Sequence, residues 1–552
     1  MEFTYRYTKP SAVSSDAGQT QLAFSPDSLR QPSFFVGQLK QNIAFREAIS
    51  ALHDVVISDM RQQPKDRDDY FNWLAQEEQR LLAEHLAQQS SIKTLVQGLR
   101  QKIAEMNRQS SKILQPYYQA QRKYFRYLWK RDLDAWYVLD PVITVHPDEV
   151  FFECFSEDES SYGKLSCNYN VFDHISDTAY GTTNIDYSQG LYNEFQKIRD
   201  YRKTTLKIDP DGFAIAAEGA ASYEEKKIDL PDSWVRGFLQ VSSAMTLPLI
   251  ALDLHPMDIH NICYLLRRHK ERVGPRAMRF TLEPGKPVTI HFEPWNHSLV
   301  CRRSIHQGEQ SHEIRVWGRR RIHILERLIP VAHKFTLYLL GDGLPCFYIA
   351  DLGDMTFTLG LSGWTANDWS RMGNFDLLAP RGQLDTETSQ RVYQALTKDW
   401  VASASQLAKQ TQLDEKSIKT ALAKYSQQGM VLFDLATQQY RIRQLSRTEL
   451  PIDALRFANP REQQSAAFVE SNLVTITDDN AWETYLDGGR ELRGTVLDNA
   501  VVYHAEITID RDQRMAEGHC HCHFFHQNKM RKGPCEHMLA LRMAAQKRRL
   551  QP

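Results

Sequence analysis

The chain has 552 residues, too many for a single hydrophobic core, so several domains are expected. Its 67 Lys and Arg nearly balance its 68 Asp and Glu. The net charge of the whole chain therefore does not attract nucleic acid or membranes, and any such binding would need a local charged patch. A hydrophobic content of 42% with 25 Phe, 23 Tyr and 10 Trp excludes a disordered chain.

The sequence indicates a cytoplasmic protein. Its first residues, MEFTYRYTKPSAVSSD, lack the basic and apolar regions of a signal peptide. No apolar run approaches the roughly 18 residues of a membrane span. Five cysteines lie far apart in the sequence and are expected to be free thiols of a reducing compartment. They are Cys154, Cys167, Cys263, Cys301 and Cys346.

The first 134 residues are predicted to be mainly helical. Residues 1–37 are rich in Ser, Pro and Gln, which predicts an irregular segment. Between 38 and 134, RQQPKDRDD separates two helical stretches, so an antiparallel helical hairpin is expected. The second helix carries an apolar stripe that fits either packing within the chain or a coiled-coil dimer. The stripe contains Ile92, Leu99, Met106 and Ile113.

Residues 135–380 are predicted to form an α+β domain. VITVHPDEVFFECF, LKIDPDGFAIA and FTLEPGKPVTIHFEP each have the pattern of two strands around a turn with Pro. PDSWVRGFLQVSSAM and HPMDIHNICYLLRRHKE predict helices.

An active site within 135–375 is a less favoured alternative. Asp342, Asp351 and Asp354 are its candidate carboxylates. However, carboxylates beside Gly are typical of turns. The chain also lacks the sequence motifs of nucleotide binding, of a nucleophilic serine and of a zinc hydrolase. The protein is therefore predicted not to be an enzyme.

Residues 381–446 have the pattern of a winged helix-turn-helix. Three helical segments are followed by MVLFDLATQQYRIR, which predicts a two-stranded wing carrying Arg441 and Arg443. Ser403 and Asp414 are predicted helix N-caps, and Gly429 is a predicted C-cap. The third helix presents lysines outward, which suits either DNA binding in a major groove or plain packing and protein contact.

The segment GHCHCHFFHQNKMRKGPCEHMLAL, 518–541, holds three of the eight cysteines and five of the nineteen histidines. Cys520 and Cys522 are two residues apart and can face the same side of a strand. Cys535 and His537 form a second pair in the first turn of a predicted helix, where unpaired backbone N–H groups favour a thiolate.

Three thiolates and one imidazole predict a closed, structural zinc site. An iron–sulfur cluster is less favoured because it normally takes four thiolates. His523 or His526 remains an alternative fourth ligand, while His519 and His521 are expected at the surface. A catalytic zinc is excluded by the expectation that Glu536 points away from the ligands.

The order CxC, spacer, CxH, followed by MLA, resembles the SWIM-type zinc finger, a ββα-like metal module. The resemblance covers about 465–545. It implies Zn²⁺ bound by Cys520, Cys522, Cys535 and His537, and a role in protein or DNA binding. The domain order is similar to that of bacterial SWIM proteins grouped with a MoxR-type AAA ATPase and a von Willebrand A protein, which are the partners it implies.

The sequence thus predicts a multidomain α+β protein that acts as a non-enzymatic zinc-binding adaptor. DNA binding by the winged helix and the finger is the alternative. Between Arg511 and Pro552, nine Lys or Arg face three Asp or Glu, a difference of +6. Such a basic stretch favours phosphate contacts. The candidate contacts are Lys529, Arg531, Lys532, Lys547, Arg548 and Arg549.

Overall fold

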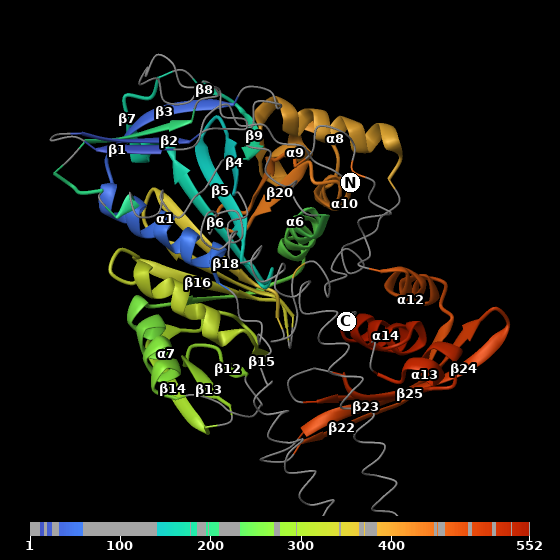
Figure 1. The fold of residues 1–552 in the computed structure, drawn as a ribbon. Helices are drawn as coiled ribbons and strands as arrows, with labels where there is room; N and C mark the ends of the chain where they lie inside the picture. Colours follow the sequence, from blue (N-terminus) through green and yellow to red (C-terminus); the bar gives the residue numbers. More distant parts are fainter. Residues whose placement is uncertain are drawn as a thin grey trace, which may run out of the picture. The chain divides into compact units, whose positions relative to one another are not determined.

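The computed structural model describes residues 12–15, 19–24, 33–58, 141–176, 178–184, 195–196, 198–201, 203–208, 232–269, 277–293, 295–341, 344–363, 369, 384–445, 450, 459–483, 488–510, 515–530 and 533–550. These residues form a mixed α/β protein with several sheets (Figure 1). Every helix within these ranges is too short or too polar to span a bilayer. The helical hairpin predicted over 38–134 lies outside the described residues beyond Ser58.

The prediction of an irregular segment over 1–37 differs from the structure, because three strands form there. β2 pairs in parallel with β10, and β3 pairs with the other edge of β10. This partner strand comes from a distant part of the chain, which a local sequence pattern cannot reveal. The sheet comprises β1 (Ala12–Ser15), β2 (Gln19–Phe24), β10 (Lys203–Ile208), β3 (Phe34–Leu39) and β7 (Phe172–Asp173), with β8 (Thr178–Ala179) also on β3.

An eight-stranded antiparallel sheet forms the centre of the middle region. Its neighbouring strands β5 and β6 are buried almost throughout. The helix α1 (Asn42–Val56) packs directly on them, because Gly163 has no side chain: a Cβ there would lie 3.1 Å from Val55. In order, the strands are β11 (Ile250–Leu254), β16 (Lys334–Leu339), β17 (Cys346–Asp351), β18 (Met355–Leu361), β6 (Ser161–Asn168), β5 (Glu149–Phe155), β4 (Val142–Val145) and β9 (Gly181–Asn184).

A second, four-stranded antiparallel sheet belongs to the same core. The strand–turn–strand patterns at 142–155 and 280–294 and the two predicted helices are all confirmed. The helix α7 begins at Pro256 and is capped by the His255 side chain. The sheet order is β14 (His297–Ile305), β13 (Pro287–Phe292), β12 (Met278–Leu282) and β15 (His312–Val316). The helical elements are η1 (Tyr169–Val171), α6 (Asp232–Met245), α7 (Pro256–Arg268) and the 3₁₀ helix η2 (Arg319–Leu328).

Residues 384–445 contain three helices and a small three-stranded sheet. The predicted caps are present: Ser403 forms a capping box with Gln406, and Asp414 accepts from the Ser417 N–H. Gly429 takes a positive φ of 71° directly after the third helix, as its predicted role requires. The elements are α8 (Thr386–Asp399), β19 (Val401–Ala402), α9 (Ala404–Thr411), α10 (Glu415–Gln427), β20 (Val431–Asp434) and β21 (Gln439–Ile442).

The last part of the chain is a four-stranded antiparallel meander with helices on one face (Figure 1). The helix α14 lies close against the sheet at Gly494 and Gly518, where a Cβ would lie 2.6 Å from the side chains of Leu541 and Met538, respectively. The first helix begins at Pro460, ahead of the predicted boundary at 465. The elements are α12 (Pro460–Glu470), β22 (Val474–Glu483), β23 (Gly488–Asp498), β24 (Val501–Asp510), β25 (Met515–Cys520), α13 (His523–Asn528) and α14 (Glu536–Leu550).

Candidate metal centre

Four potential metal ligands converge at the end of β25 and the start of α14. Their ligand atoms all lie within 4.8 Å of one another, and all four side chains are buried. These are the four predicted ligands, Cys520, Cys522, Cys535 and His537. The group can therefore hold a metal ion, as the paired spacing in the sequence indicated.

Each ligand occupies the end of a secondary-structure element. Cys520 is the last residue of β25, and Cys522 is the N-cap of α13, where its sulfur accepts from the Phe525 N–H at 3.4 Å. The expectation that both cysteines share one strand is thus wrong for Cys522. Cys535 immediately precedes α14, and its carbonyl accepts the first helical hydrogen bond. His537 follows within the first turn of that helix.

The donor spacing fits a tetrahedral zinc ion. Zn–S bonds of about 2.3 Å and Zn–N bonds of about 2.0–2.1 Å place sulfur and nitrogen about 3.6 Å apart at the tetrahedral angle. The Sγ of Cys520 lies 3.7 Å from Nδ1 of His537. The chemistry of the donor set, three thiols and one imidazole, is also that of structural zinc sites.

Electrostatics favour a cation among these donors. Hydrogen bonding to Cys520, and then burial, raise the pKa of the Cys535 thiol, while burial raises the pKa of Cys522. Three thiolates cannot crowd into so small a volume without a compensating charge. A divalent cation supplies that charge and deprotonates coordinating thiols.

The imidazole of His537 is held by residues that the sequence did not single out. Its Nε2 lies 3.4 Å from Oδ2 of Asp498, at the end of β23. The Tyr503 ring stacks on it with centroids 4.2 Å apart, and the Phe468 ring is nearly parallel to it at 5.8 Å. These contacts leave Nδ1 facing the thiols. No spacing rule relates these three residues to the CxC and CxH pairs.

The helix α12 supports the loop that carries the second ligand pair. The Ser465 hydroxyl donates to the carbonyl of Glu536 at 2.8 Å, and Arg461 donates to the carbonyl of Pro534 at 2.8 Å. The expectation that Glu536 points away from the ligands is wrong, since its Oε1 lies 3.8 Å from Nδ1 of His537. This carboxylate is nevertheless outside the group of four converging donors.

The remaining histidines of the segment lie at the surface, as predicted. His519, His521, His523 and His526 are all exposed. Neither His523 nor His526 belongs to the converging group, so neither replaces His537 in this structure.

The candidate phosphate contacts are only partly described. Lys529 and Arg548 are exposed, and Lys547 is partly buried. The Nζ of Lys529 lies 5.1 Å above the Phe525 ring, next to the ligand loop. Arg531 and Lys532 lie outside the described residues, as does the side chain of Arg549.

Two of the three candidate carboxylates of an enzyme accept structural hydrogen bonds. Asp351 accepts from the Gly353 N–H at 2.9 Å, which is a turn contact, and Asp354 accepts from the Gln41 amide at 2.9 Å. Asp342 lies outside the described residues.

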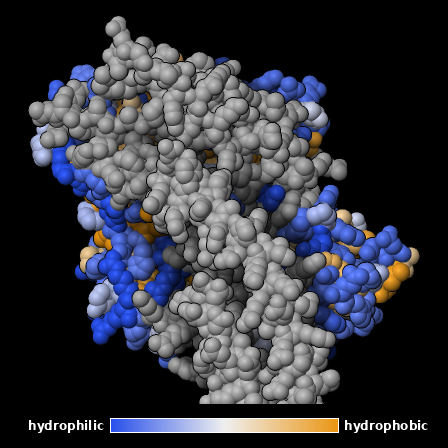
Figure 2. Space-filling model, viewed as in Figure 1, coloured by the Kyte–Doolittle hydropathy of each residue, from blue (hydrophilic) through white to orange (hydrophobic). Residues whose placement is uncertain are grey.

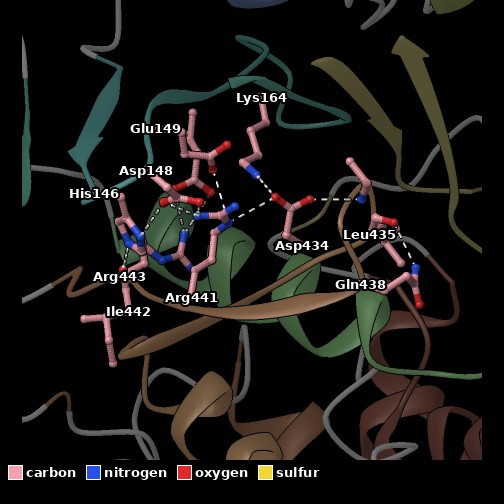
Figure 3. A network of polar contacts seen from close by, with 12 residues as sticks. His146, Asp148, Glu149, Lys164, Asp434, Leu435, Gln438, Arg441, Ile442 and Arg443 are labelled. Carbon is pink, nitrogen blue, oxygen red and sulfur yellow. Dashed lines mark hydrogen bonds and ion pairs between the residues drawn. The ribbon is translucent and has the colours of Figure 1, made fainter. Parts of the chain in front are cut away.

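A buried ionic cluster that sequence reasoning missed joins β20 and β21 to the central sheet (Figure 3). Asp434 accepts from Lys164 at 3.0 Å and lies 3.3 Å from Arg441. Arg441 also pairs with Asp148 at 2.8 Å and with Glu149 at 3.2 Å. Burial raises the pKa of Glu149 to about 7. Burial also acts to raise the pKa of Asp434, but Lys164 and Arg441 outweigh it and lower the pKa to about 2.

A second buried arginine extends this contact. Arg443 pairs with Glu153 at 3.0 Å and donates to the Ser242 hydroxyl at 2.8 Å. Beside it, the His146 ring contacts the carbonyl of Ile442 at 2.5 Å. The two arginines that the sequence placed on the wing therefore point into the protein. Their buried ion pairs connect the end of the segment 384–445 to the central sheet.

No protein-family model matches the chain, and no curated protein matches it. Among solved structures, the proliferating cellular nuclear antigen of Entamoeba histolytica is similar to 41% of the chain, over 89% of its own length. The identity is 11% and the TM-score is 0.30, a similarity too low to bear on function.

Proposed function

We propose that the chain is a cytoplasmic, non-enzymatic zinc-binding adaptor whose last module, 459–550, is a SWIM-type zinc finger. The observation that carries the proposal is the closed set of four buried donors, Cys520, Cys522, Cys535 and His537. A catalytic zinc keeps a coordination position for water or substrate, whereas a structural zinc is enclosed by four protein ligands. Zinc is the preferred ion because thiolate and imidazole ligands in tetrahedral geometry select it.

The zinc would supply the folding energy of this module. Its own core is small, and the ligands Cys520, Cys522 and Cys535 are themselves part of the buried cluster beneath α14. In small modules of this kind, metal binding and folding are one process. The metal would thus hold the β23–β24 hairpin and α14 in the arrangement that a partner recognises.

An apolar hairpin end supports a protein partner. Leu497, Val501 and Val502 lie at the turn of the β23–β24 hairpin and are 40%, 50% and 54% exposed. Leu497 and Val502 are directly opposite each other. Figure 2 shows this end as an orange patch at the right of the view. Grouped exposed aliphatic side chains are typical of protein contact surfaces, and the SWIM resemblance suggests a MoxR-type AAA ATPase or a von Willebrand A protein as the partner.

The segment 384–445 fits a winged helix used for packing. Arg441 and Arg443, the arginines of its wing, are buried in ion pairs with the central sheet. A wing in that arrangement does not present them to a phosphate backbone. This favours protein assembly over DNA binding by this segment.

Nucleic-acid binding by the finger is the second candidate function. Lys529 and Arg548 are exposed; Lys529 lies between the two ligand pairs in sequence, and Arg548 lies after the second pair. Lysine and arginine near a small zinc module suit sequence-independent phosphate contacts. However, Arg542, which adds to the basic count of this stretch, is buried rather than on the surface.

A pull-down with the full-length chain tests the proposed function. We expect stoichiometric recovery of an AAA ATPase or a von Willebrand A protein from the native host. The Val501→Glu/Val502→Glu double variant should lose that partner while keeping its zinc. Val300→Glu is the matched control, because Val300 is equally exposed on β14 and should leave recovery unchanged. Recovery of nucleic acid without a protein partner would overturn the proposal.

A further inference from the structure

A second group of potential metal ligands lies between α7 and η2, outside the C-terminal module. The ligand atoms of Cys263, His323 and Glu326 lie within 4.8 Å of one another. Cys263 is buried on α7, and the two residues of η2 are half-buried. In a 3₁₀ helix, residues i and i+3 lie on the same face, which brings His323 and Glu326 together above the thiol.

The His–Glu pair is already formed. Nδ1 of His323 lies 3.0 Å from Oε1 of Glu326. The other carboxylate oxygen of Glu326 pairs with Arg267. A carboxylate ligand is commonly oriented in this way, with one oxygen on the metal and the other hydrogen-bonded. The Cys263 thiol donates to the carbonyl of Ile322 at 3.7 Å.

We propose that Cys263, His323 and Glu326 form a second zinc site with three protein ligands and one position open to solvent. One thiolate, one neutral imidazole and one carboxylate carry a charge of −2, which balances a divalent cation. Cysteine, histidine and carboxylate are all zinc ligands, and three of them leave one tetrahedral position for water or an external ligand. The metal would clamp α7 to η2.

This site binds more weakly than the C-terminal one. It has fewer ligands, and Arg267 and Arg320 add positive charge beside it. Arg320 donates to the carbonyls of Leu266 and His269 at the end of α7, and its positive charge repels a cation. The zinc of this site should therefore be removed by a chelator that leaves the C-terminal zinc in place.

Zinc titration of the full-length protein against a chromophoric competing chelator tests the site. We expect Cys263→Ala and His323→Gln each to take up one zinc fewer per chain than the wild type. His323→Gln is the safer variant, because its half-exposed side chain is not part of the core. Both variants should keep the tightly bound zinc that Cys522→Ser removes, which separates this site from the C-terminal one.

His333→Gln is the matched control. His333 also lies beside a carboxylate, Asp351, at 3.9 Å, but it is exposed and no cysteine belongs to its pair. It should take up as much zinc as the wild type. With cobalt in place of zinc, the proposed site at Cys263 should give a sulfur-to-cobalt charge-transfer band in the absorption spectrum. The Cys263→Ala variant should lack this band. Unchanged zinc uptake in either Cys263→Ala or His323→Gln would overturn the proposal.

Discussion

Nε2 of His537 lies 3.4 Å from Oδ2 of Asp498, and this contact ties the metal centre to the end of the β23–β24 hairpin. The other ring nitrogen faces the sulfur of Cys520 at 3.7 Å. A carboxylate on the far nitrogen fixes the tautomer and orientation of a metal-binding imidazole and raises its basicity. The same hairpin end carries Tyr503, which stacks on the ring.

Replacing Asp498 should weaken zinc binding without removing a ligand. We expect Asp498→Ala to lower zinc affinity by about 10–100-fold, the usual effect of losing such a partner. Competition titration against a chelator of known affinity measures the change. Asp478→Ala, an exposed aspartate on the neighbouring strand β22, is the control and should bind zinc like the wild type. Equal affinity of Asp498→Ala and the wild type would show that the contact does not orient the ligand.

Removing one thiolate should unfold the C-terminal module alone. In Cys522→Ser we expect loss of zinc and loss of hydrogen-exchange protection across 459–550, because metal binding serves as folding energy there. Protection should persist in the central sheet, whose core cluster is separate. His523→Gln and His526→Gln, both exposed, should keep the zinc. Loss of protection along the whole chain would contradict an independently folding module.

Local patterns in the sequence predicted much of this site and of the helices. The CxC and CxH pairs identified all four converging donors, because the positions of two donors a residue apart depend on local backbone geometry. The caps at Ser403 and Asp414 were predicted for the same reason: a capping bond spans only three residues. The geometry of each ligand pair and of each helix cap depends only on residues within about one helical turn of it in sequence.

Features that depend on distant segments were not predictable in this way. Asp498 and Phe468 reach His537 only through the packing of β23 and α12 on α14. Arg443 and Glu153 form a buried pair that crosses from β5 to the residue after β21. From the sequence alone, Arg443 could only be expected on a solvated wing. The hydrophobic periodicity of the sequence does not reveal such pairs, since it reports only on the helix or strand in which each partner lies.

The buried cluster around Asp434 should make a large contribution to the stability of the middle region. Breaking a buried ion pair by removing one partner costs about 3–5 kcal/mol, because it leaves the other charge uncompensated. We expect Asp434→Asn to lower the free energy of unfolding by this amount near pH 7, because it removes the carboxylate that pairs with Lys164 and one of the three carboxylates around Arg441. Urea unfolding, monitored by hydrogen exchange in β5 and β6, measures this change in the free energy of unfolding. Glu415→Gln, which removes an exposed pair with Lys419, should cost less than about 1 kcal/mol.

The effect of Asp434→Asn should depend on pH in a defined direction. The pKa of Asp434 is lowered to about 2 in the folded protein, against an ordinary value of about 3.9. The folded state therefore binds fewer protons than the unfolded state between these values, so the carboxylate stabilises the fold fully above about pH 4. As the pH falls toward 2, the difference between the wild type and Asp434→Asn should shrink. A difference that stays constant over this window would show that the charge of Asp434 is not what stabilises the contact.

Salt dependence should separate the two binding functions of the finger. If it holds nucleic acid, the Lys529→Gln/Arg531→Gln/Lys532→Gln variant should weaken binding to all sequences alike, because phosphate contacts carry no base information. The slope of log affinity against log salt should fall by up to about 2.7, from three contacts at about 0.9 each. Replacing Lys416, Lys419 and Lys424 by Gln is the matched control, since these exposed lysines of α10 carry the same total charge outside the finger.

If the protein-adaptor proposal holds, DNA binding should be weak at physiological salt for the wild type and both variants, and the partner should still be recovered with each of them. We expect this second result, because the exposed aliphatic end of the β23–β24 hairpin is an apolar surface and the arginines of the wing are buried.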